Sequence, residues 1–234
     1  MQREKIIDGY KKGIVADAGI IAQGRGEAFD YILGERTIEP ARNAEKMAVI
    51  ALLLAGNPVI SINGNVAALA SEGVIALSKA LPAKVEVNIF YRTQERMDAL
   101  IGLMKGLGLK DILGEESDAK IPGLESERAK CTQVGIFTSD VVFVPLEDGD
   151  RAQALKNMGK KVICVDLNPF SRTSVTSDIS IVDNLVRVLP NMVDMTKELK
   201  GLPEDRLRSE LAAFSNIENL KGCVQEIKTG LDRF

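Results

Sequence analysis

Short runs of β-branched and other apolar residues alternate with longer helical patterns along most of this chain. Residues 59–62, 141–144 and 162–165 are short, mostly apolar runs rich in β-branched residues, and their length is typical of buried strands. The first two runs lead through a turn into a segment with helical periodicity, and the third leads through a turn into a further predicted strand and then a helix. Strands that alternate with helices predict βαβ units, and therefore an α/β fold with a mostly parallel sheet and helices on both faces.

We expect one α/β domain over residues 1–200, whose N-terminal helical portion, residues 1–56, packs on the sheet, and a helical tail over residues 201–234. The predicted strands are residues 59–62, 84–91, 141–144, 162–165 and 179–182. The predicted helices are residues 3–14, 28–33, 40–55, 66–81, 93–106, 150–158 and 184–199. Residues 19–27 are predicted to form a Gly-rich loop, and residues 107–136 are the least regular part of the chain.

Composition excludes several kinds of chemistry. The chain contains no histidine, which excludes Ser-His-Asp and Cys-His catalysis and removes the usual zinc ligands. Its three cysteines are far apart and show neither metal spacing nor a disulfide framework. A net charge of -3 gives no reason to expect nucleic acid as a partner. The longest apolar stretch, residues 47–56, is too short to span a bilayer, so we expect a cytoplasmic protein without a membrane partner.

The loops that follow the strands are the expected ligand sites of a parallel sheet. The strongest candidate is the run from Val165 to Thr173. Asp166 ends a buried strand and suits a ribose hydroxyl or a metal-bound water, while Ser171, Arg172 and Thr173 offer donors to a phosphate. The alternative is an Asx-turn with a hydroxyl-rich loop, but the convergence of donors favours an anion site.

Other segments carry weaker signals. The Asn63-Gly64-Asn65 turn leads into a helix and can cradle an anion, although an ordinary turn with an Asn cap is slightly favoured. The glycines that flank Arg25 mildly favour a ligand site, because they let the backbone approach a phosphate. Arg92 precedes the predicted cap Thr93, and a ligand and a solvated side chain are equally good interpretations there.

Carboxylates follow two further strands. Glu147, Asp148 and Asp150 could hold Mg²⁺ or a substrate amine, but acidic residues at a helix N-terminus are the favoured interpretation from sequence alone. Asp183 and Asn184 end the last predicted strand, where either residue would also serve as a simple helix cap.

Seven blocks of the chain resemble the archaeal 4-phosphopantoate–β-alanine ligases, also called phosphopantothenate synthetases. The resemblance runs in order from about Arg3 to about residue 200. The blocks are GRGEAFDYILGERTIEPA (24–41), NPVISINGNVAAL (57–69), VEVNIFYRT (85–93), IPGLESER (121–128), VVFVPLEDGDR (141–151), VDLNPFSRT (165–173) and ISIVDNLVR (179–187).

This resemblance implies an ATP-dependent amide ligase of coenzyme A biosynthesis. Such an enzyme joins 4-phosphopantoate to β-alanine through an acyl-adenylate and releases AMP and pyrophosphate, with Mg²⁺ expected beside the ATP. The resemblance also implies a Rossmann-like core and a homodimer. Carried over residue by residue, it assigns to ATP binding Arg3, Arg25, Asp166, Leu167, Asn168, Arg172, Thr173, Asp183, Asn184 and Leu185.

The remaining assignments rest on strand-end position. They give Asn63, Asn65 and Arg92 to the phosphopantoate, and Glu147 and Asp148 to the β-alanine ammonium or the metal.

The chain departs from the family pattern in two places. Gln23 stands where the family usually has His before the GRGE motif, and Met1-Gln2-Arg3 stands where it usually has a His-Pro-Arg-Tyr segment ahead of the first helix. These departures keep a non-catalytic nucleotide-sensing protein open as an alternative. A Rossmann-type oxidoreductase is the other alternative, but its GxGxxG loop is absent after the first strand.

Overall fold

The computed structural model describes residues 1–146 and 148–232. Within these residues, six strands form one sheet in which every neighbouring pair is parallel. The strands, in sheet order, are β3 (Ile112–Leu113), β2 (Lys84–Val87), β1 (Pro58–Ile62), β6 (Val141–Pro145), β7 (Lys161–Val165) and β8 (Ile179–Ile181). A small antiparallel pair, β4 (Ala119–Lys120) and β5 (Lys130–Cys131), lies outside it. The predicted parallel α/β fold is confirmed.

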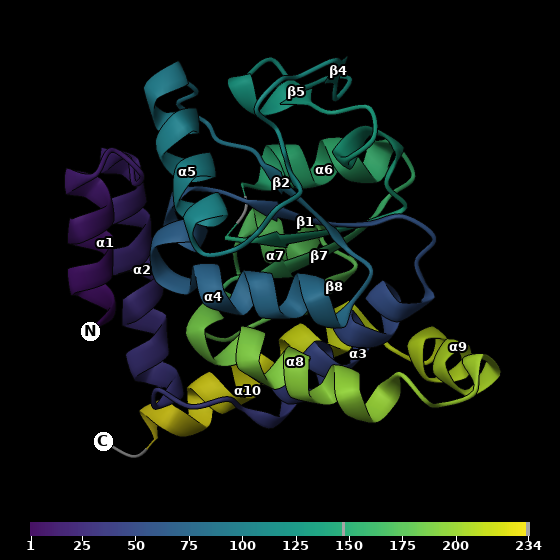
Figure 1. Cartoon of the computed structure of the whole chain (residues 1–234). Coiled ribbons are helices and arrows are strands. Elements are labelled where there is room, and N and C mark those ends of the chain that lie inside the picture. Colours follow the sequence, from purple (N-terminus) through teal and green to yellow (C-terminus); the bar gives the residue numbers. More distant parts are fainter. Residues whose placement is uncertain (147, 233–234) are drawn as a thin grey trace.

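Helices surround the sheet on both faces. Figure 1 shows α3, α4 and α8 on one side of the strands and α6 on the other. The α-helices are α1 (Gln2–Lys11), α2 (Asp17–Leu33), α3 (Glu39–Leu54), α4 (Gly64–Ala80), α5 (Gln94–Gly106), α6 (Gly149–Asn157), α7 (Arg172–Thr176), α8 (Leu185–Leu199), α9 (Glu204–Ala212) and α10 (Asn216–Leu231). The short 3₁₀ helices are η1 (Glu127–Ala129) and η2 (Ile136–Thr138).

Alternate residues of the central strands enter opposite cores. On β6, Val141 and Phe143 join the large core beneath α4 and α8, whereas Val142 and Val144 join the core that contains Leu155 of α6. All five residues of this strand are buried. Burial on both faces explains why the strand is a continuous apolar run rather than an alternating one.

The order of strands reverses between β1 and β6, because β2 and β3 extend the sheet one way while β7 and β8 extend it the other way. In parallel sheets the crevice at such a switch point is the usual ligand site. The segment between α1 and α2 packs beside this switch point, at the start of α4. A Cβ on Gly64, at the start of α4, would lie only 2.1 Å from the Ile14 carbonyl oxygen, so this position requires glycine.

Residues 19–27 form part of the single long helix α2 and not the predicted loop. Packing and helix continuity outweigh the low helix propensity of the glycines at positions 19, 24 and 26. Among the described atoms, a Cβ on Gly24 would meet nothing within 4 Å, and one on Gly26 would make only an ordinary contact. Close backbone approach therefore does not explain these two glycines.

Other predicted boundaries also shift. The strand predicted over residues 84–91 ends at Val87, so Arg92 does not directly follow it. A short helix, α7, occupies residues that were predicted as a turn. The irregular region contributes the edge strand β3 through only two residues, Ile112 and Leu113, which is too short a run for a periodicity to predict.

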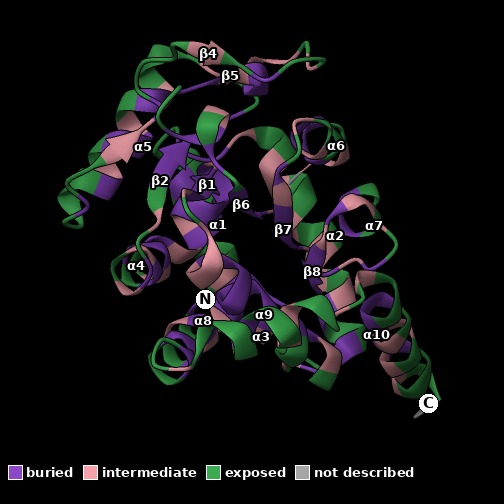
Figure 2. Ribbon diagram, turned by 90° about the vertical axis from the view of Figure 1, so that its right-hand side faces the viewer, coloured by how far each residue is buried: buried purple, intermediate pink, exposed green. Residues whose placement is uncertain are grey.

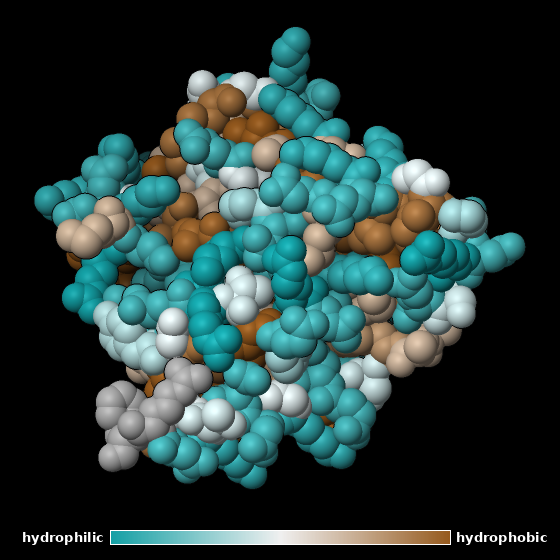
Figure 3. All heavy atoms as spheres, turned by 90° about the horizontal axis from the view of Figure 1, so that it is seen from below, coloured by the Kyte–Doolittle hydropathy of each residue, from teal (hydrophilic) through white to brown (hydrophobic). Residues whose placement is uncertain are grey.

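The C-terminal helices pack on the rest of the molecule. Leu207 of α9 belongs to the large core. Leu220, Cys223 and Ile227 of α10 form a further cluster that includes Leu167, next to the predicted site. Figure 2 shows buried segments on α10 where it faces α7 and β8. Seen from below, the face that carries α8 and the C-terminal helices is largely hydrophilic, with small apolar areas between polar side chains (Figure 3).

Candidate functional site

The segment after β7 folds back on its own carboxylate. Asp166 accepts hydrogen bonds from the Ser171 hydroxyl at 2.5 Å and from the backbone N–H of Asn168 at 2.9 Å. The Asn168 side-chain oxygen in turn accepts one from the backbone N–H of Phe170 at 2.9 Å. An Asx-turn is therefore present, and it fixes a carboxylate at the carboxyl end of an interior strand.

The environment of Asp166 also brings in α2. Burial raises the pKa of the Asp166 carboxyl, and hydrogen bonds from its own turn and the positive charge of Arg25 offset this in part. A Cβ on Gly26 would lie 3.5 Å from the Leu167 side chain. The exposed Arg25 and the turn at Asp166, which are far apart in sequence, thus lie close together.

Arg172 and Thr173 begin α7 but differ in accessibility. Nη1 of Arg172 donates a hydrogen bond to Asp150 at 2.7 Å, and both side chains are exposed. Thr173 is buried, and its carbonyl accepts a hydrogen bond from the Ser177 hydroxyl at 2.8 Å. Exposed ion pairs contribute only about 0–1 kcal/mol, so Arg172 can leave Asp150 for a phosphate at small cost.

Asp183 and Asn184 join β8 to α8 and are buried. Asp183 accepts hydrogen bonds from the Thr37 hydroxyl at 2.6 Å and from Nε of Arg187 at 2.8 Å. The Asn184 amide donates to Asp30 of α2 at 2.7 Å. The side-chain oxygen of Asn184 caps α8, so the predicted cap is confirmed. These two side chains are engaged within the protein.

Arg3 lies on α1 beside α2. Its Nε donates a hydrogen bond to Glu27 at 2.9 Å, and its Nη2 donates to the Tyr31 hydroxyl at 2.7 Å. The hydrogen bond from Arg3 is the main reason that the pKa of the Glu27 carboxyl is lowered. The Arg3 side chain is largely exposed, so it too is available to an anion.

Gln2 links three segments. Its side-chain oxygen accepts a hydrogen bond from the Asn184 amide at 3.1 Å and one from the Gln23 amide at 3.4 Å. Gln23 therefore lies beside the turn at Asn184. It is the residue that stands where the family that the chain resembles usually has histidine. The N-terminal helices contribute to this place as directly as the strand ends do.

We call the place where α1 and α2 meet the turns at residues 166–168 and 183–185 the β7–β8 edge. It brings together the turn at Asp166, which lies within reach of the charge of Arg25, and the turn at Asn184, which contacts Gln2 of α1. The exposed side chain of Arg3, the next residue on α1, contacts Glu27 and Tyr31 of α2. Leu185 lies behind this edge, buried in the large core. Arg25 beside the half-buried turn at Asp166, with the exposed Arg3 on the adjoining helix, forms a place suited to a phosphorylated ligand.

The predicted residues Asn63 and Asn65 at the switch point mainly contact backbone groups of neighbouring segments. Asn63 caps α4 by accepting a hydrogen bond from the Val66 N–H at 3.1 Å, and its amide donates to the Leu146 carbonyl at 2.8 Å. Leu146 has a φ of 58°, which is uncommon for a residue other than glycine. The Asn65 amide donates to the Gly19 carbonyl at 2.8 Å.

Asp148, which follows β6 on the other side of the switch point, caps α6 by accepting a hydrogen bond from the backbone N–H of Arg151 at 3.0 Å. It also pairs with the buried Arg128 at 3.2 Å. Burial raises the pKa of Asp148, but the hydrogen bond from Arg151 and the charges of both arginines bring it below its ordinary value. Arg128, which also donates to Asn88 at 3.3 Å, was not predicted. Glu147 lies outside the described residues.

Arg92 does not reach the crevice through a strand end, as its sequence position had suggested. Its Nη2 donates hydrogen bonds to the carbonyls of Gly114 at 2.6 Å and Glu115 at 3.1 Å, in the loop after β3. Thr93 accepts a hydrogen bond from the Arg96 N–H at 3.4 Å and caps α5 as predicted.

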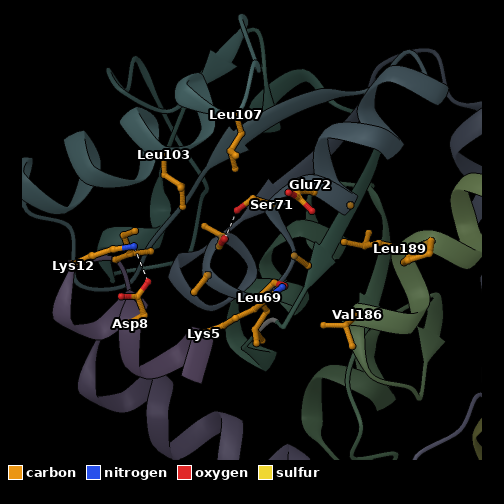
Figure 4. Close-up of a pocket in the computed structure, with 17 residues that line it drawn as sticks. Lys5, Asp8, Lys12, Leu69, Ser71, Glu72, Leu103, Leu107, Val186 and Leu189 are labelled. Carbon is orange, nitrogen blue, oxygen red and sulfur yellow. Dashed lines mark hydrogen bonds and ion pairs between the residues drawn. The ribbon is translucent and has the colours of Figure 1, made fainter. Parts of the chain in front are cut away.

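A cavity of about 390 Å³ lies elsewhere, between α1, α4, α5 and α8. Figure 4 shows apolar side chains around it, including Leu69 and Leu189, with Lys5 and Lys12 on α1. None of the residues predicted for ligand binding lines it. The candidate ligand site is therefore better supported at the strand ends than in this cavity.

The described residues contain no group of three or more acidic residues or cysteines that could hold a metal ion by themselves. Over the same part of the chain, no helix has the length and apolarity needed to cross a membrane.

The comparisons with known proteins agree with one another. A family model described as phosphopantothenate/pantothenate synthetase matches residues 40–230. A protein of Thermococcus kodakarensis named 4-phosphopantoate–beta-alanine ligase is 50% identical over 232 residues, which cover 99% of this chain and 89% of the relative. Proteins with the same name from Methanosarcina mazei and Methanospirillum hungatei are 48% and 51% identical, over 99% and 84% of this chain and 91% and 80% of their own lengths.

Proposed function

Because the chain belongs to the phosphopantothenate/pantothenate synthetase family, we propose that it is an ATP-dependent ligase that condenses 4-phosphopantoate with β-alanine in coenzyme A biosynthesis. The name shared by relatives that are about 50% identical over nearly the whole chain supports this assignment. The observations that support the site are the charge of Arg25 at the Asp166 carboxylate and the contact of Gln2, the neighbour of Arg3, with the turn at Asn184.

The proposed reaction has two steps. In the first step, the carboxylate of 4-phosphopantoate attacks the α-phosphorus of ATP, a P–O bond forms to the acyl oxygen, and pyrophosphate leaves. In the second step, the amine of β-alanine attacks the acyl carbon, loses a proton and expels AMP. No protein nucleophile is needed, which is compatible with a chain that has no histidine. The protein must instead bind charge and orient three substrates.

ATP is assigned to the β7–β8 edge. Arg25 and Arg3, on adjacent helices, are placed to face the phosphates, and Arg172 joins them by exchanging its exposed contact with Asp150. The backbone of the turns at residues 166–168 and 183–185 offers groups for the ribose and base. The buried side chains of Thr173, Asp183 and Leu185 then shape the site without reaching the ligand themselves.

We expect Mg²⁺ to arrive with the ATP phosphates. Protein sites for Mg²⁺ in such reactions commonly use one or two carboxylates together with substrate phosphates. Asp166, at the carboxyl end of β7, is the carboxylate of the site that fits this requirement. The bound ion would neutralise charge on the phosphates, and the charge of Arg25 offsets part of the burial that raises the pKa of the same carboxylate.

The phosphopantoate and β-alanine are assigned to the crevice at the switch point. Asn63 and Asn65 lie on one side of it, and Asp148 with Arg128 lies on the other. Glu147 remains part of this weaker proposal through its sequence position after β6, whereas Arg92, which contacts the loop after β3, has lost the strand-end position on which its assignment rested. The family resemblance further supports a cytoplasmic homodimer, and sedimentation at micromolar protein concentration tests the dimer.

A direct assay tests the proposed function. The protein is mixed with ATP, Mg²⁺, 4-phosphopantoate and β-alanine, and AMP and 4′-phosphopantothenate are measured by chromatography. AMP that depends on both acceptors is the expected result. ATP binding without AMP formation would instead identify a nucleotide-sensing protein, and the omission of each acceptor in turn controls for ATP hydrolysis.

A further inference from the structure

Arg187 of α8 holds two buried carboxylates that come from distant parts of the chain. Its Nη2 donates to Asp30 of α2 at 2.5 Å, and its Nη1 donates to the other oxygen of the same carboxylate at 3.3 Å. It also contacts Asp183 through Nη2, and through Nε at 2.8 Å. The Asp30 and Asp183 side chains are only 6% and 0% exposed. The guanidinium fork therefore fastens α2 to the β8–α8 turn with well-defined geometry.

Asn184 shares this arrangement. Its amide donates to the Asp30 carboxylate at 2.7 Å and to Gln2 of α1 at 3.1 Å. Asp183 is held on its other side by Thr37, in the segment between α2 and α3. The contacts of this turn with Gln2, Asp30 and Thr37 thus join the start of α8 to the N-terminal helices and to the segment that follows them.

We propose that Asp30 and Arg187 are positioning residues for the nucleotide. They fix α2 against the turn at Asn184, so that Arg25, five positions before Asp30 on the same helix, faces the triphosphate at the β7–β8 edge. This inference rests on the proposed ATP site, but it adds residues that make no contact with the ligand. Their effect passes through the placement of α2 and of Asn184.

The test requires conservative substitutions, because these side chains form buried ion pairs. Loss of one partner of a buried ion pair is strongly destabilising, because it leaves a buried charge without compensation. Arg187→Met would strand two carboxylates and could prevent folding. Asp30→Asn keeps the shape and can still accept one hydrogen bond, while Arg187→Lys keeps the charge but loses the two-pronged contact.

The experiment measures ATP affinity by calorimetry and the separate KM values of the three substrates. We expect Asp30→Asn and Arg187→Lys to weaken ATP binding and raise the KM for ATP by about tenfold or more. The KM for β-alanine should change by less than about threefold. Arg36→Lys is the matched control, since its ion pair with Glu226 also joins the end of α2 to another helix but is exposed.

A purely structural role would give a different result. Both variants would then lose thermal stability or kcat through a smaller active fraction, with an unchanged ATP KM and dissociation constant, and that outcome overturns the inference. The wild-type AMP assay decides the proposed function separately. If the wild-type protein binds ATP without forming AMP, the ligase assignment fails, while the calorimetric comparison of the variants still decides the positioning role.

Discussion

At the scale of single residues, the site depends on arginines whose carboxylate partners differ in burial. The pair between Arg172 and Asp150 is exposed, whereas Arg187 binds carboxylates that are almost fully buried. Exposed pairs contribute little to stability and exchange partners readily. This difference separates arginines that can bind a substrate from arginines that hold the structure.

Arg172→Ala should lower AMP formation without affecting the fold. A hydrogen bond between charged groups contributes about 1.5–3 kcal/mol, so we expect kcat/KM for ATP to fall by roughly 10- to 100-fold. Asp150→Asn is the matched control, because it removes the competing carboxylate and leaves Arg172 in place. Steady-state kinetics at fixed acceptor concentrations provide the measurement. Unchanged kinetics in Arg172→Ala would remove this residue from the site.

Glu45 predicts a dependence of stability on pH. It is buried in α3 and accepts hydrogen bonds from the Asn191 amide at 3.1 Å, and burial raises its pKa from 4.5 to about 7. The folded protein therefore binds more protons than the unfolded chain between these values. Stability should fall as the pH rises through this window and level off above about pH 7, a loss of about 3 kcal/mol.

Glu45→Gln should remove most of this dependence. The glutamine oxygen can still accept from Asn191, so the variant should be more stable than the wild type at about pH 8.5 and nearly equal at about pH 5. Urea unfolding at both pH values measures the difference. The exposed Glu198→Gln on α8 serves as a control, and parallel curves for Glu45→Gln and the wild type would contradict the assignment.

Single residues also show where prediction from sequence stops. The run from Asp166 to Thr173 could be predicted because strand, carboxylate and donors are adjacent in sequence. Asp30 and Arg187 could not, because their contact spans 157 positions and neither lies in a local pattern that indicates it. Asn88 could have been proposed from the sequence as a polar residue at a strand end, because it directly follows β2. Buried polar partners in distant segments depend on the packing of whole elements.

At the scale of elements, most strands and helices follow from periodicity, and the failures have specific causes. The central strands were predicted to within one or two residues because burial on both faces makes them continuous apolar runs. The N-terminal part of α2 was missed because three glycines occupy positions 19, 24 and 26. Tertiary packing supplies the helix with stability that local propensity does not.

The helical state of residues 19–27 makes a prediction about Gly24. Replacing a glycine by alanine in a helix interior raises the free energy of unfolding by about 0.5–1 kcal/mol. The described atoms leave room for the added methyl group at position 24. Gly24→Ala should therefore raise the free energy of unfolding in urea. Gly34→Ala, at a φ of 80°, should lower it. A destabilised Gly24→Ala protein would favour a loop over the observed helix.

At the scale of the whole molecule, α10 protects the outer edge of the sheet. Asn216 accepts a hydrogen bond from the backbone N–H of Ser180 on β8 at 2.8 Å, and the Asn219 amide donates to the Ser180 carbonyl at 2.9 Å. β8 is the last strand on its side of the sheet. Unpaired edge strands invite pairing with other chains, so the helix satisfies backbone groups that would otherwise be available.

Removal of residues 216–234 should therefore destabilise the fold and leave the edge strand β8 uncovered. It exposes the cluster around Leu167 and Val182 and removes three buried apolar side chains, a loss on the order of 5 kcal/mol. We expect a lower unfolding midpoint, weaker ATP binding and concentration-dependent association by light scattering. Ile217→Ser, at an exposed position on the same helix, is the control. A truncated protein with an unchanged midpoint and no association would contradict this role of α10.

The contacts between the N-terminal helices and the β8–α8 turn have a consequence for folding during synthesis of the chain. α1 and α2 are synthesised long before α8, so Gln2 can contact Asn184 only after 182 further residues have been made, and Asp30 can contact Arg187 only after 157 further residues. The central strand β1 can meanwhile recruit β2 on one side and later β6 on the other. Contacts of such long sequence separation form late. The nascent chain should thus gain affinity for nucleotide abruptly once residues 184–187 have been made and can fold, and pulse-labelled chains arrested before residue 184 should not be retained on immobilised ATP.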